Sequence, residues 1–277
     1  MSRTTWFWIL ALVITLAAAV YQRRTGPTYA LSGAAELDGR TIAYTLDRSH
    51  GGETDHRVAI NTGDALVTGL VEWRRSKTAD RWTTVPMVFG DGRLSADLPH
   101  QPPAGKLEYR VTLQRGEQTV LLPPDGPVVI RFKGDVPLFV LIPHVIAMFG
   151  AMLLSSRTGL EFFSPVPKLT PLIHWTIGFL AVGGLVLGPI VQKYAFDAFW
   201  TGWPFGQDLT DNKTAVALLG WVVAALALKR ARKPAAWAFG AAILLFVVYL
   251  IPHSVLGSEI DYSKESGKTE QGGGGIP

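Results

Sequence analysis

Residues 128–156, VVIRFKGDVPLFVLIPHVIAMFGAMLLSS, decide the fold class because two kinds of chain meet within them. The first part, from Val128 to Lys133, is rich in β-branched and aromatic residues and favours a β-strand. The second part, from Val136 to Ser156, contains no Asp, Glu, Lys or Arg and has the length of about 20 residues that a membrane-spanning helix needs. Only Gly134 and Asp135 separate them, so a strand is predicted to lead almost directly into a membrane span.

The composition differs on the two sides of this boundary. The whole chain is 48% hydrophobic and 17% charged, whereas globular proteins average about 25% charged residues. The deficit lies mostly after residue 135, which predicts a membrane protein with a soluble domain attached. We expect an N-terminal transmembrane anchor (1–24), an extracytoplasmic β-sandwich (25–135), a four-helix transmembrane bundle (136–256) and a disordered extracytoplasmic tail (257–277).

Five apolar segments are candidate membrane spans, and none of them contains Asp, Glu, Lys or Arg: Trp6–Tyr21, Val136–Ser156, Pro171–Val191, Thr214–Leu228 and Ala235–Ile251. The first span also resembles a signal peptide, with small residues at Ala17–Ala19 that are typical of a cleavage site. No polar region separates the apolar run from these alanines, which favours an uncleaved anchor. Within the third span, Gly184 and Gly188 form a small-xxx-small pair that predicts close approach of another helix.

Basic residues near the ends of the spans predict the orientation. The run from Lys229 to Lys233 lies between the last two spans and is therefore expected in the cytoplasm. Residues 156–170, with Arg157 and Lys168, are placed on the same side, whereas Arg23 and Arg24 oppose this orientation. The prediction is a multi-pass protein of the cell (inner) membrane with a cytoplasmic N-terminus. The sandwich, the 192–213 loop and the C-terminal tail are then extracytoplasmic.

The net charge of +4 does not indicate nucleic-acid binding, because the densest basic run lies between two apolar spans. The chain has no cysteine, which excludes disulfides, iron–sulfur clusters and thiol chemistry.

The segment from Thr28 to Lys133 alternates apolar and polar residues with period two, and Gly, Pro and Asp turn signals divide it. This pattern predicts an all-β, immunoglobulin-like sandwich, similar to cysteine-free sandwiches of the fibronectin type III kind. His50 and His56 flank a loop rich in Gly and Asp, for which a solvated hairpin is a better interpretation than a metal site.

The tetrapeptide LIPH occurs twice, ending at His144 and at His253. Each proline removes a backbone donor inside or at the end of a span, and the carbonyl that it frees needs another partner in lipid. The adjacent histidine is one candidate for that partner. Both histidines belong to the outer half of the membrane, whereas His174 lies near the inner end of its span.

Ionisable residues within a membrane indicate a functional site. One hypothesis is therefore that His144 and His253 ligate heme b or a divalent metal near the outer face. Asp208 and Asp211 are weaker candidates for metal ligands, because helix capping explains them better.

The outer loop carries an aromatic belt in which Trp200, Trp203 and Phe205 are predicted to bind a partner. No hydrolase elbow, phosphate-binding loop or metalloprotease motif is present, so the sequence identifies no enzyme activity. The favoured prediction is an accessory or scaffold subunit of an envelope or respiratory complex. It would bind the bilayer and other membrane or periplasmic subunits, but no nucleic acid. The alternative is a cytochrome-b-like or metal-binding electron-transfer protein.

Overall fold

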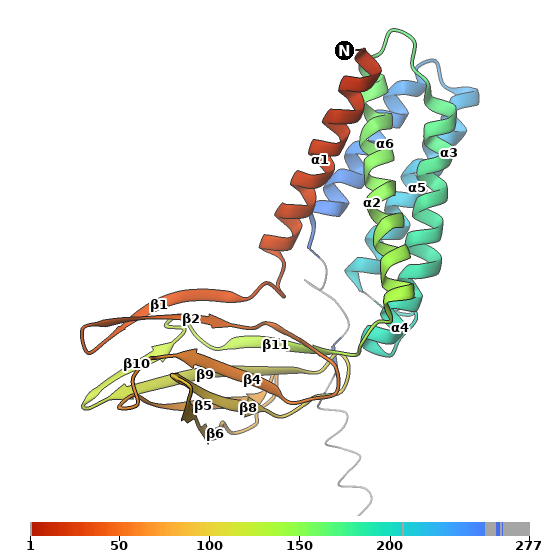
Figure 1. Cartoon of the computed structure of the whole chain (residues 1–277). Coiled ribbons are helices and arrows are strands. Elements are labelled where there is room, and N and C mark those ends of the chain that lie inside the picture. Colours follow the sequence, from red (N-terminus) through yellow and green to blue (C-terminus); the bar gives the residue numbers. More distant parts are fainter. Residues whose placement is uncertain (1, 207, 253–258, 261, 263–277) are drawn as a thin grey trace, which may run out of the picture. The chain divides into compact units, whose positions relative to one another are not determined.

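The computed structural model describes residues 2–206, 208–252, 259–260 and 262 of the 277-residue chain. The chain forms two compact units (Figure 1). The helical unit comprises the described residues of 1–27 and 136–258, and the β-rich unit comprises those of 28–135 and 259–277. An N-terminal apolar helix, a β-rich middle region and several apolar helices therefore follow one another, in the order that the sequence predicts.

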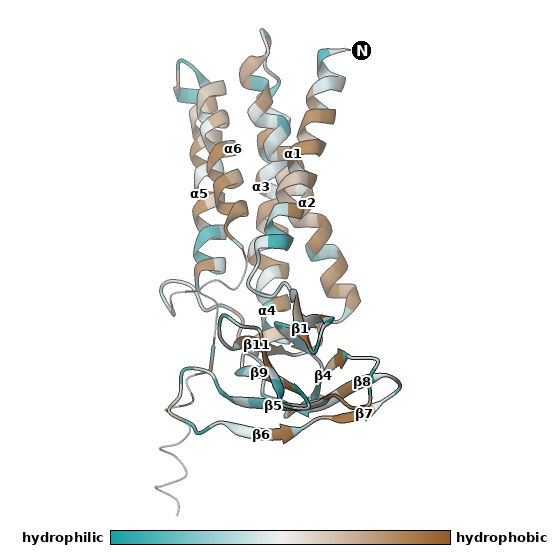
Figure 2. Cartoon of the chain, turned by 90° about the vertical axis from the view of Figure 1, so that its left-hand side faces the viewer, coloured by the Kyte–Doolittle hydropathy of each residue, from teal (hydrophilic) through white to brown (hydrophobic). Residues whose placement is uncertain are grey.

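The helical unit begins with α1 (Arg3–Thr25) and continues after the β-rich region. Its later elements are α2 (Leu138–Leu160), the short η1 (Glu161–Phe163), α3 (Leu169–Leu180), the π-helical η2 (Ala181–Leu187), α4 (Gly188–Phe196), α5 (Leu209–Arg230) and α6 (Pro234–Leu250). The hydropathy colouring of Figure 2 shows that apolar residues dominate most of their length.

Four helical stretches of the described chain are long and apolar enough to cross a membrane: Arg3–Thr25, Leu138–Phe163, Leu169–Phe196 and Leu209–Arg230. This finding indicates a multi-pass membrane protein. The helix α6 is as apolar but has only 17 residues, at the lower limit of about 17 to 25 residues for a span.

The N-terminal helix is part of the core of the helical unit. Ala18 of α1 is buried in the same apolar cluster as Ala151 and Met152 of α2. The side chain of Gln22 donates a hydrogen bond of 2.8 Å to the carbonyl of Tyr249 in α6. The first helix therefore packs on α2 and α6.

Alanines make up much of the buried surface of the bundle, since Ala217, Ala224 and Ala238 are each at most 1% exposed. Small side chains let membrane helices approach closely, and this close packing drives their association because lipid supplies no hydrophobic force between helices.

The β-rich unit has three sheets around one apolar core. The first sheet is the hairpin β1 (Leu31–Leu37) and β2 (Arg40–Leu46). The second has the strand order β3-β11-β9-β5-β6, with β10 also paired to β9, and the third has the order β4-β8-β7. The bounds are β3 (Ser49–Gly51), β4 (His56–Asn61), β5 (Thr68–Arg75), β6 (Thr83–Pro86), β7 (Val88–Gly90), β8 (Arg93–Leu98), β9 (Lys106–Arg115), β10 (Gln118–Leu122) and β11 (Val128–Lys133).

The period-two pattern is the physical basis of this core, because alternate side chains of a strand point to the same face. Leu107, Tyr109, Val111 and Leu113 of β9 are all fully buried, while the residues between them are partly exposed. The β1–β2 hairpin turns at Asp38 and Gly39, both with positive φ, as the turn favoured in two-residue hairpins requires.

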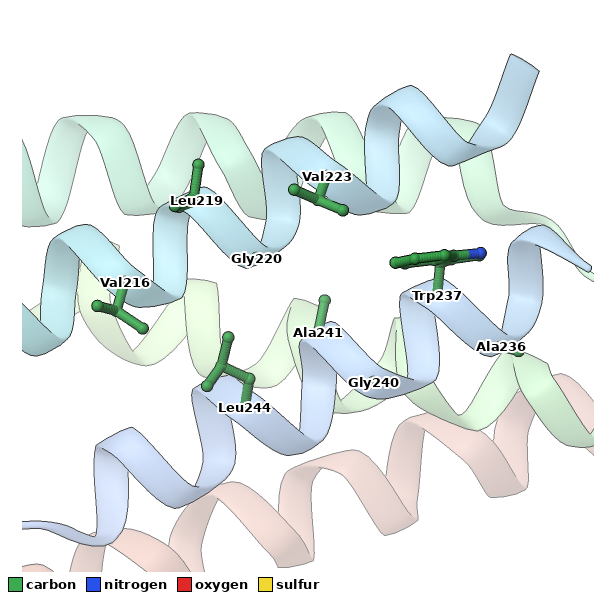
Figure 3. Close-up of a pocket in the computed structure, with 9 residues that line it drawn as sticks. All are labelled: Val216, Leu219, Gly220, Val223, Ala236, Trp237, Gly240, Ala241 and Leu244. Carbon is green, nitrogen blue, oxygen red and sulfur yellow. The ribbon is translucent and has the colours of Figure 1, made fainter. Parts of the chain in front are cut away.

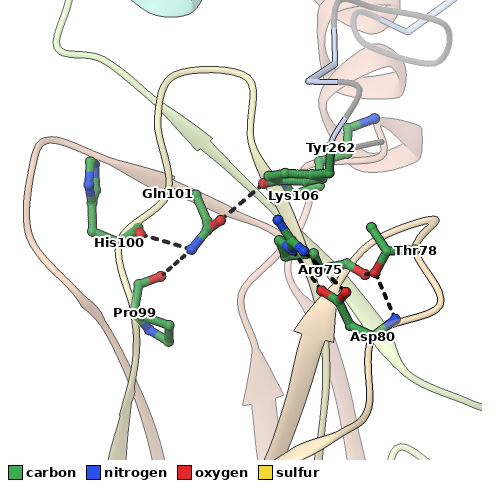
Figure 4. Close-up of polar contacts among 8 residues, drawn as sticks. All are labelled: Arg75, Thr78, Asp80, Pro99, His100, Gln101, Lys106 and Tyr262. Carbon is green, nitrogen blue, oxygen red and sulfur yellow. Dashed lines mark hydrogen bonds and ion pairs between the residues drawn. The ribbon is translucent and has the colours of Figure 1, made fainter. Parts of the chain in front are cut away.

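Residues that follow α6 in sequence pack on the β-rich unit (Figure 4). The hydroxyl of Tyr262 accepts a hydrogen bond from the Lys106 N–H at 3.0 Å and donates one to Gln101 Oε1 at 3.1 Å. Glu259 forms ion pairs with Lys77 and, at 2.5 Å, with Lys106. These contacts differ from the free tail expected from residue 257 onward, and the other residues of that segment lie outside the described part of the chain.

Candidate functional site

His144 is held by the neighbouring third span. Its side chain lies on α2, half-buried, with Nδ1 2.9 Å from the carbonyl oxygen of Gly183 in η2. A carbonyl only accepts hydrogen bonds, so Nδ1 carries the proton and donates it. The unprotonated nitrogen of the neutral ring is then Nε2, which has no hydrogen-bond partner in the described part of the chain.

The carbonyl that accepts from His144 belongs to a π-helical segment. The N–H of Gly188 donates to the same Gly183 oxygen, five residues earlier in the chain, which is the π-helical pattern. Single π-helical turns inside α-helices are frequent at functional sites. The sequence predicted that the proline beside His144 would leave a carbonyl in need of a partner. The bond that the structure gives His144 is instead to a carbonyl of another span.

Glycines allow the spans to meet at this point. A Cβ on Gly183 would lie 2.9 Å from both Ala147 Cβ and Met148 Sδ of α2, closer than real side chains approach. A Cβ on Gly184 would clash with Thr214 of α5. The predicted close approach is therefore present at Gly184 and, beyond the prediction, at Gly183. At Gly188, the second residue of the predicted pair, a Cβ would meet the nearest atom of another helix, His144 Cε1, only at 3.8 Å.

The proposed second ligand, His253, lies outside the described residues, so its distance from His144 is not tested. His174 is exposed on α3, and its Nδ1 lies 2.7 Å from the carbonyl of Thr170 one turn earlier. Across residues 2–206, 208–252, 259–260 and 262, no three His, Asp or Glu side chains form a group that could hold a metal ion.

We call the segment between α4 and α5, residues 197–208, the aromatic loop. A buried carboxylate holds the backbone of this loop in place. Asp211, in the first turn of α5, is 8% exposed. Its Oδ2 accepts hydrogen bonds from the N–H of Thr201 at 2.7 Å and of Gly202 at 3.0 Å. Asn212 continues this pattern, because its Oδ1 accepts from the N–H of Trp203 at 2.7 Å.

Further polar groups surround Asp211. With its amide nitrogen turned toward Asp211, Gln192 donates to both carboxylate oxygens at 3.0 and 3.2 Å and accepts from the Thr201 hydroxyl at 2.6 Å. Asp208 caps α5, since its Oδ1 accepts from the N–H of Thr210 at 2.7 Å. Asp208 therefore caps the helix, as the capping interpretation of the sequence expects, whereas Asp211 accepts from the loop backbone.

The aromatic side chains of this loop point away from its polar interior. Trp203 is 78% exposed and Phe205 is 83% exposed. Trp200 is half-buried, and its Nε1 donates to the carbonyl of Trp203 at 3.2 Å. The loop therefore presents exposed aromatic rings on a backbone that side chains of α4 and α5 hold in place.

Two charged contacts of the helical unit were missed by the sequence reading. Lys213 of α5 is 7% exposed and donates to the carbonyl of Ile251 at the end of α6, at 2.6 Å. Arg157 and Glu161 form a 2.6 Å ion pair in which both side chains are only 4% exposed. The predicted spans end at Ser156 and begin at Thr214, so these charges fall in the predicted loops. The i,i+4 spacing of Arg157 and Glu161 is nevertheless a signal of pairing on one helix.

The β-rich unit contains a histidine pair. His50 Nε2 lies 2.8 Å from the Thr54 carbonyl, and the Nδ1 atoms of His50 and His56 lie 3.3 Å apart. Because the carbonyl fixes the proton of His50 on Nε2, His50 Nδ1 accepts from His56. Burial lowers the pKa of His56, with Asp47 opposing and His50 reinforcing this shift. The two rings are therefore joined by a hydrogen bond.

No protein-family model matches the chain, and a search of curated proteins finds no significant match.

Proposed function

We propose that this chain is an accessory or scaffold subunit of an envelope or respiratory complex in the inner membrane. It binds a partner protein through the aromatic loop and through the β-rich unit, which we interpret as an immunoglobulin-like sandwich. The observation that carries the proposal is the contrast between the exposed Trp203 and Phe205 and the fixed backbone beneath them. Aromatic side chains provide much of the binding energy at protein interfaces. A backbone that is already ordered loses little entropy when it binds.

The proposed topology places these surfaces on one side of the membrane. The β-rich unit follows the C-terminal end of α1 and precedes α2. Glu259 and Tyr262 pack on this same unit, so the chain returns to that side after α6. An even number of crossings must separate α2 from residue 259, and α2, the α3–α4 stretch, α5 and α6 supply four. This parity requires the short α6 to cross, and its 17 residues rise about 25 Å. The loop of Lys229–Lys233 is then on the side opposite the β-rich unit, and the positive-inside rule assigns that side to the cytoplasm.

Site-specific photo-crosslinking in native membranes tests the partner proposal. A photoreactive amino acid replaces Phe205, and a matched probe replaces Val166, which is 75% exposed in the loop between η1 and α3. We expect a discrete protein adduct from position 205 and none from position 166. The adduct is expected to disappear when Asp211→Ala releases the loop backbone. Adducts with lipid alone at position 205 would contradict the proposal and would indicate an interfacial anchor.

A second function is favoured by one contact of His144. Metal-ligating histidines usually donate their other ring N–H to a carbonyl or carboxylate, and His144 donates Nδ1–H to the Gly183 carbonyl. This leaves Nε2 available to ligate heme b or a divalent metal together with His253. The test is the visible spectrum and metal content of protein purified after heme-supplemented expression. A Soret band that is lost in His144→Ala supports the second function, whereas a colourless, metal-free sample removes it.

A further inference from the structure

We infer that the cytoplasmic ends of α5 and α6 form a specific binding site for one anionic phospholipid. The site has two parts: a groove between the two helices for an acyl chain, and the cationic loop Lys229–Lys233 for the headgroup. The inference does not depend on the partner proposed for the aromatic loop.

The groove between α5 and α6 has a volume of about 500 Å³, within the range of about 300 to 1,000 Å³ that is usual for ligand pockets (Figure 3). Its lining is apolar: Val216, Leu219, Gly220, Val223, Ala236, Trp237, Gly240, Ala241 and Leu244. Figure 3 shows Val223 and Trp237 at the end of the groove nearer the connecting loop and Val216 and Leu244 at the other end. Within a membrane, such a groove is filled from the lipid phase.

The charge at one end of the groove selects the lipid. Lys229, Arg230, Arg232 and Lys233 are all exposed, and none forms an ion pair with a described residue. The groove begins at Ala236 on α6, only three residues after Lys233. Basic residues beside a cleft between membrane helices bind anionic headgroups, and each Lys or Arg near the surface favours anionic lipid by about fivefold. A phospholipid joins these two features, because it carries a phosphate at the interface and an acyl chain below it.

Two residues of the groove support this geometry. Trp237 lies at the loop-side end of the groove and is 52% exposed, and tryptophans are enriched at membrane interfaces. Gly240 is exposed, and a Cβ built on it meets no atom within 4 Å. A Cβ at position 240 therefore enters open space in the wall of the groove.

The test measures lipid retention by native mass spectrometry of the full-length protein in mild detergent, titrated with phosphatidylglycerol or phosphatidylcholine. Gly240→Leu fills the groove, and Gly178→Leu is the matched control, since a Cβ on exposed Gly178 of α3 also meets no atom within 4 Å. Arg232→Gln with Lys233→Gln removes half of the cationic loop and keeps Lys229 and Arg230 as topology signals.

We expect the wild-type chain and Gly178→Leu to bind phosphatidylglycerol at least about tenfold more tightly than phosphatidylcholine. Gly240→Leu is expected to lose the tightly bound phosphatidylglycerol. The double glutamine variant is expected to fold normally and to weaken the preference by at least about fivefold, because two of the four basic residues remain. Equal retention of both lipids by the wild-type chain would overturn the inference. So would unchanged phosphatidylglycerol binding in Gly240→Leu, or a wild-type chain that instead buries the groove against a second copy.

Discussion

The order of the aromatic loop depends most on the carboxylate of Asp211. Asp211→Ala removes the acceptor of the Thr201 and Gly202 N–H groups without adding a new group. A buried donor left without a partner costs about 1 to 3 kcal/mol, and two donors lose their acceptor here; hydration of these amides in the opened loop would recover part of that cost. We therefore expect the local opening of the loop to become easier by about 2 to 4 kcal/mol, which is about 30-fold to 1,000-fold in its equilibrium constant.

Hydrogen exchange of the backbone amides in 199–206 measures this opening directly. We expect faster exchange at Thr201 and Gly202, and no change in the β-rich unit. Asp197→Asn is the matched control, because this carboxylate lies in the same loop, is 76% exposed and, among the described residues, forms an ion pair with Lys193 alone. An exposed ion pair contributes about 0 to 1 kcal/mol, so the control is expected to exchange like the wild-type chain.

Two results would refute this reasoning. If Asp211→Ala leaves the exchange of both amides within about threefold of wild type, the carboxylate does not order the loop. If Asp197→Asn increases exchange as much as Asp211→Ala does, the effect is one of general charge and not of the buried hydrogen bonds.

Three further predictions concern packing, charge and pH. Gly183→Ala is expected to lower the free energy of unfolding of the detergent-solubilised protein by about 1 to 3 kcal/mol, because the new Cβ meets Ala147 and Met148. Gly178→Ala is expected to leave this free energy unchanged. Arg157→Leu leaves the buried Glu161 carboxylate without its cation and is expected to lower the free energy of unfolding by about 3 to 5 kcal/mol. Lys193→Gln, at an exposed ion pair, is expected to lower it by less than about 1 kcal/mol. Equal unfolding temperatures for the two variants would contradict this prediction. Because the folded pKa of His56 lies below its ordinary value of 6.5, the unfolded chain binds more protons as the pH falls below 6.5. The stability of the β-rich unit should then decrease from pH 6.5 down through the folded pKa, and a pH titration of His56→Phe should lack this decrease.

The order of the elements could be predicted from the sequence because it depends on local signals. The charge-free run after Val136 indicates a membrane span, and the alternating residues of β9 indicate a strand with one buried face. Neither pattern depends on which element packs against it. Cap positions are local in the same way, and Asp208 caps α5 as the sequence expects.

The contacts that build the candidate site depend on residues far apart in the chain, and the sequence does not encode these pairings locally. The bond from His144 to Gly183 spans 39 residues, and it requires a π-helical turn that no local pattern predicts. In the sequence, Lys213 directly precedes an apolar run that begins at Thr214. Only the packing of α5 on α6 brings Lys213 Nζ within hydrogen-bond distance of the Ile251 carbonyl. Gln22 similarly shows that the first helix joins the bundle through a bond to α6.

The membrane topology is the central claim, because the partner surface requires one face and the lipid site requires the other. The chain has no cysteine, so single-cysteine variants report accessibility without a background signal. The variants are Val88→Cys in β7, Phe205→Cys in the aromatic loop, Val166→Cys between η1 and α3, and Ala231→Cys between α5 and α6, labelled with a membrane-impermeant maleimide on intact cells. The account predicts labelling at positions 88 and 205, and labelling at 166 and 231 only after the membrane is permeabilised. Labelling of 231 together with 88 on intact cells would contradict it.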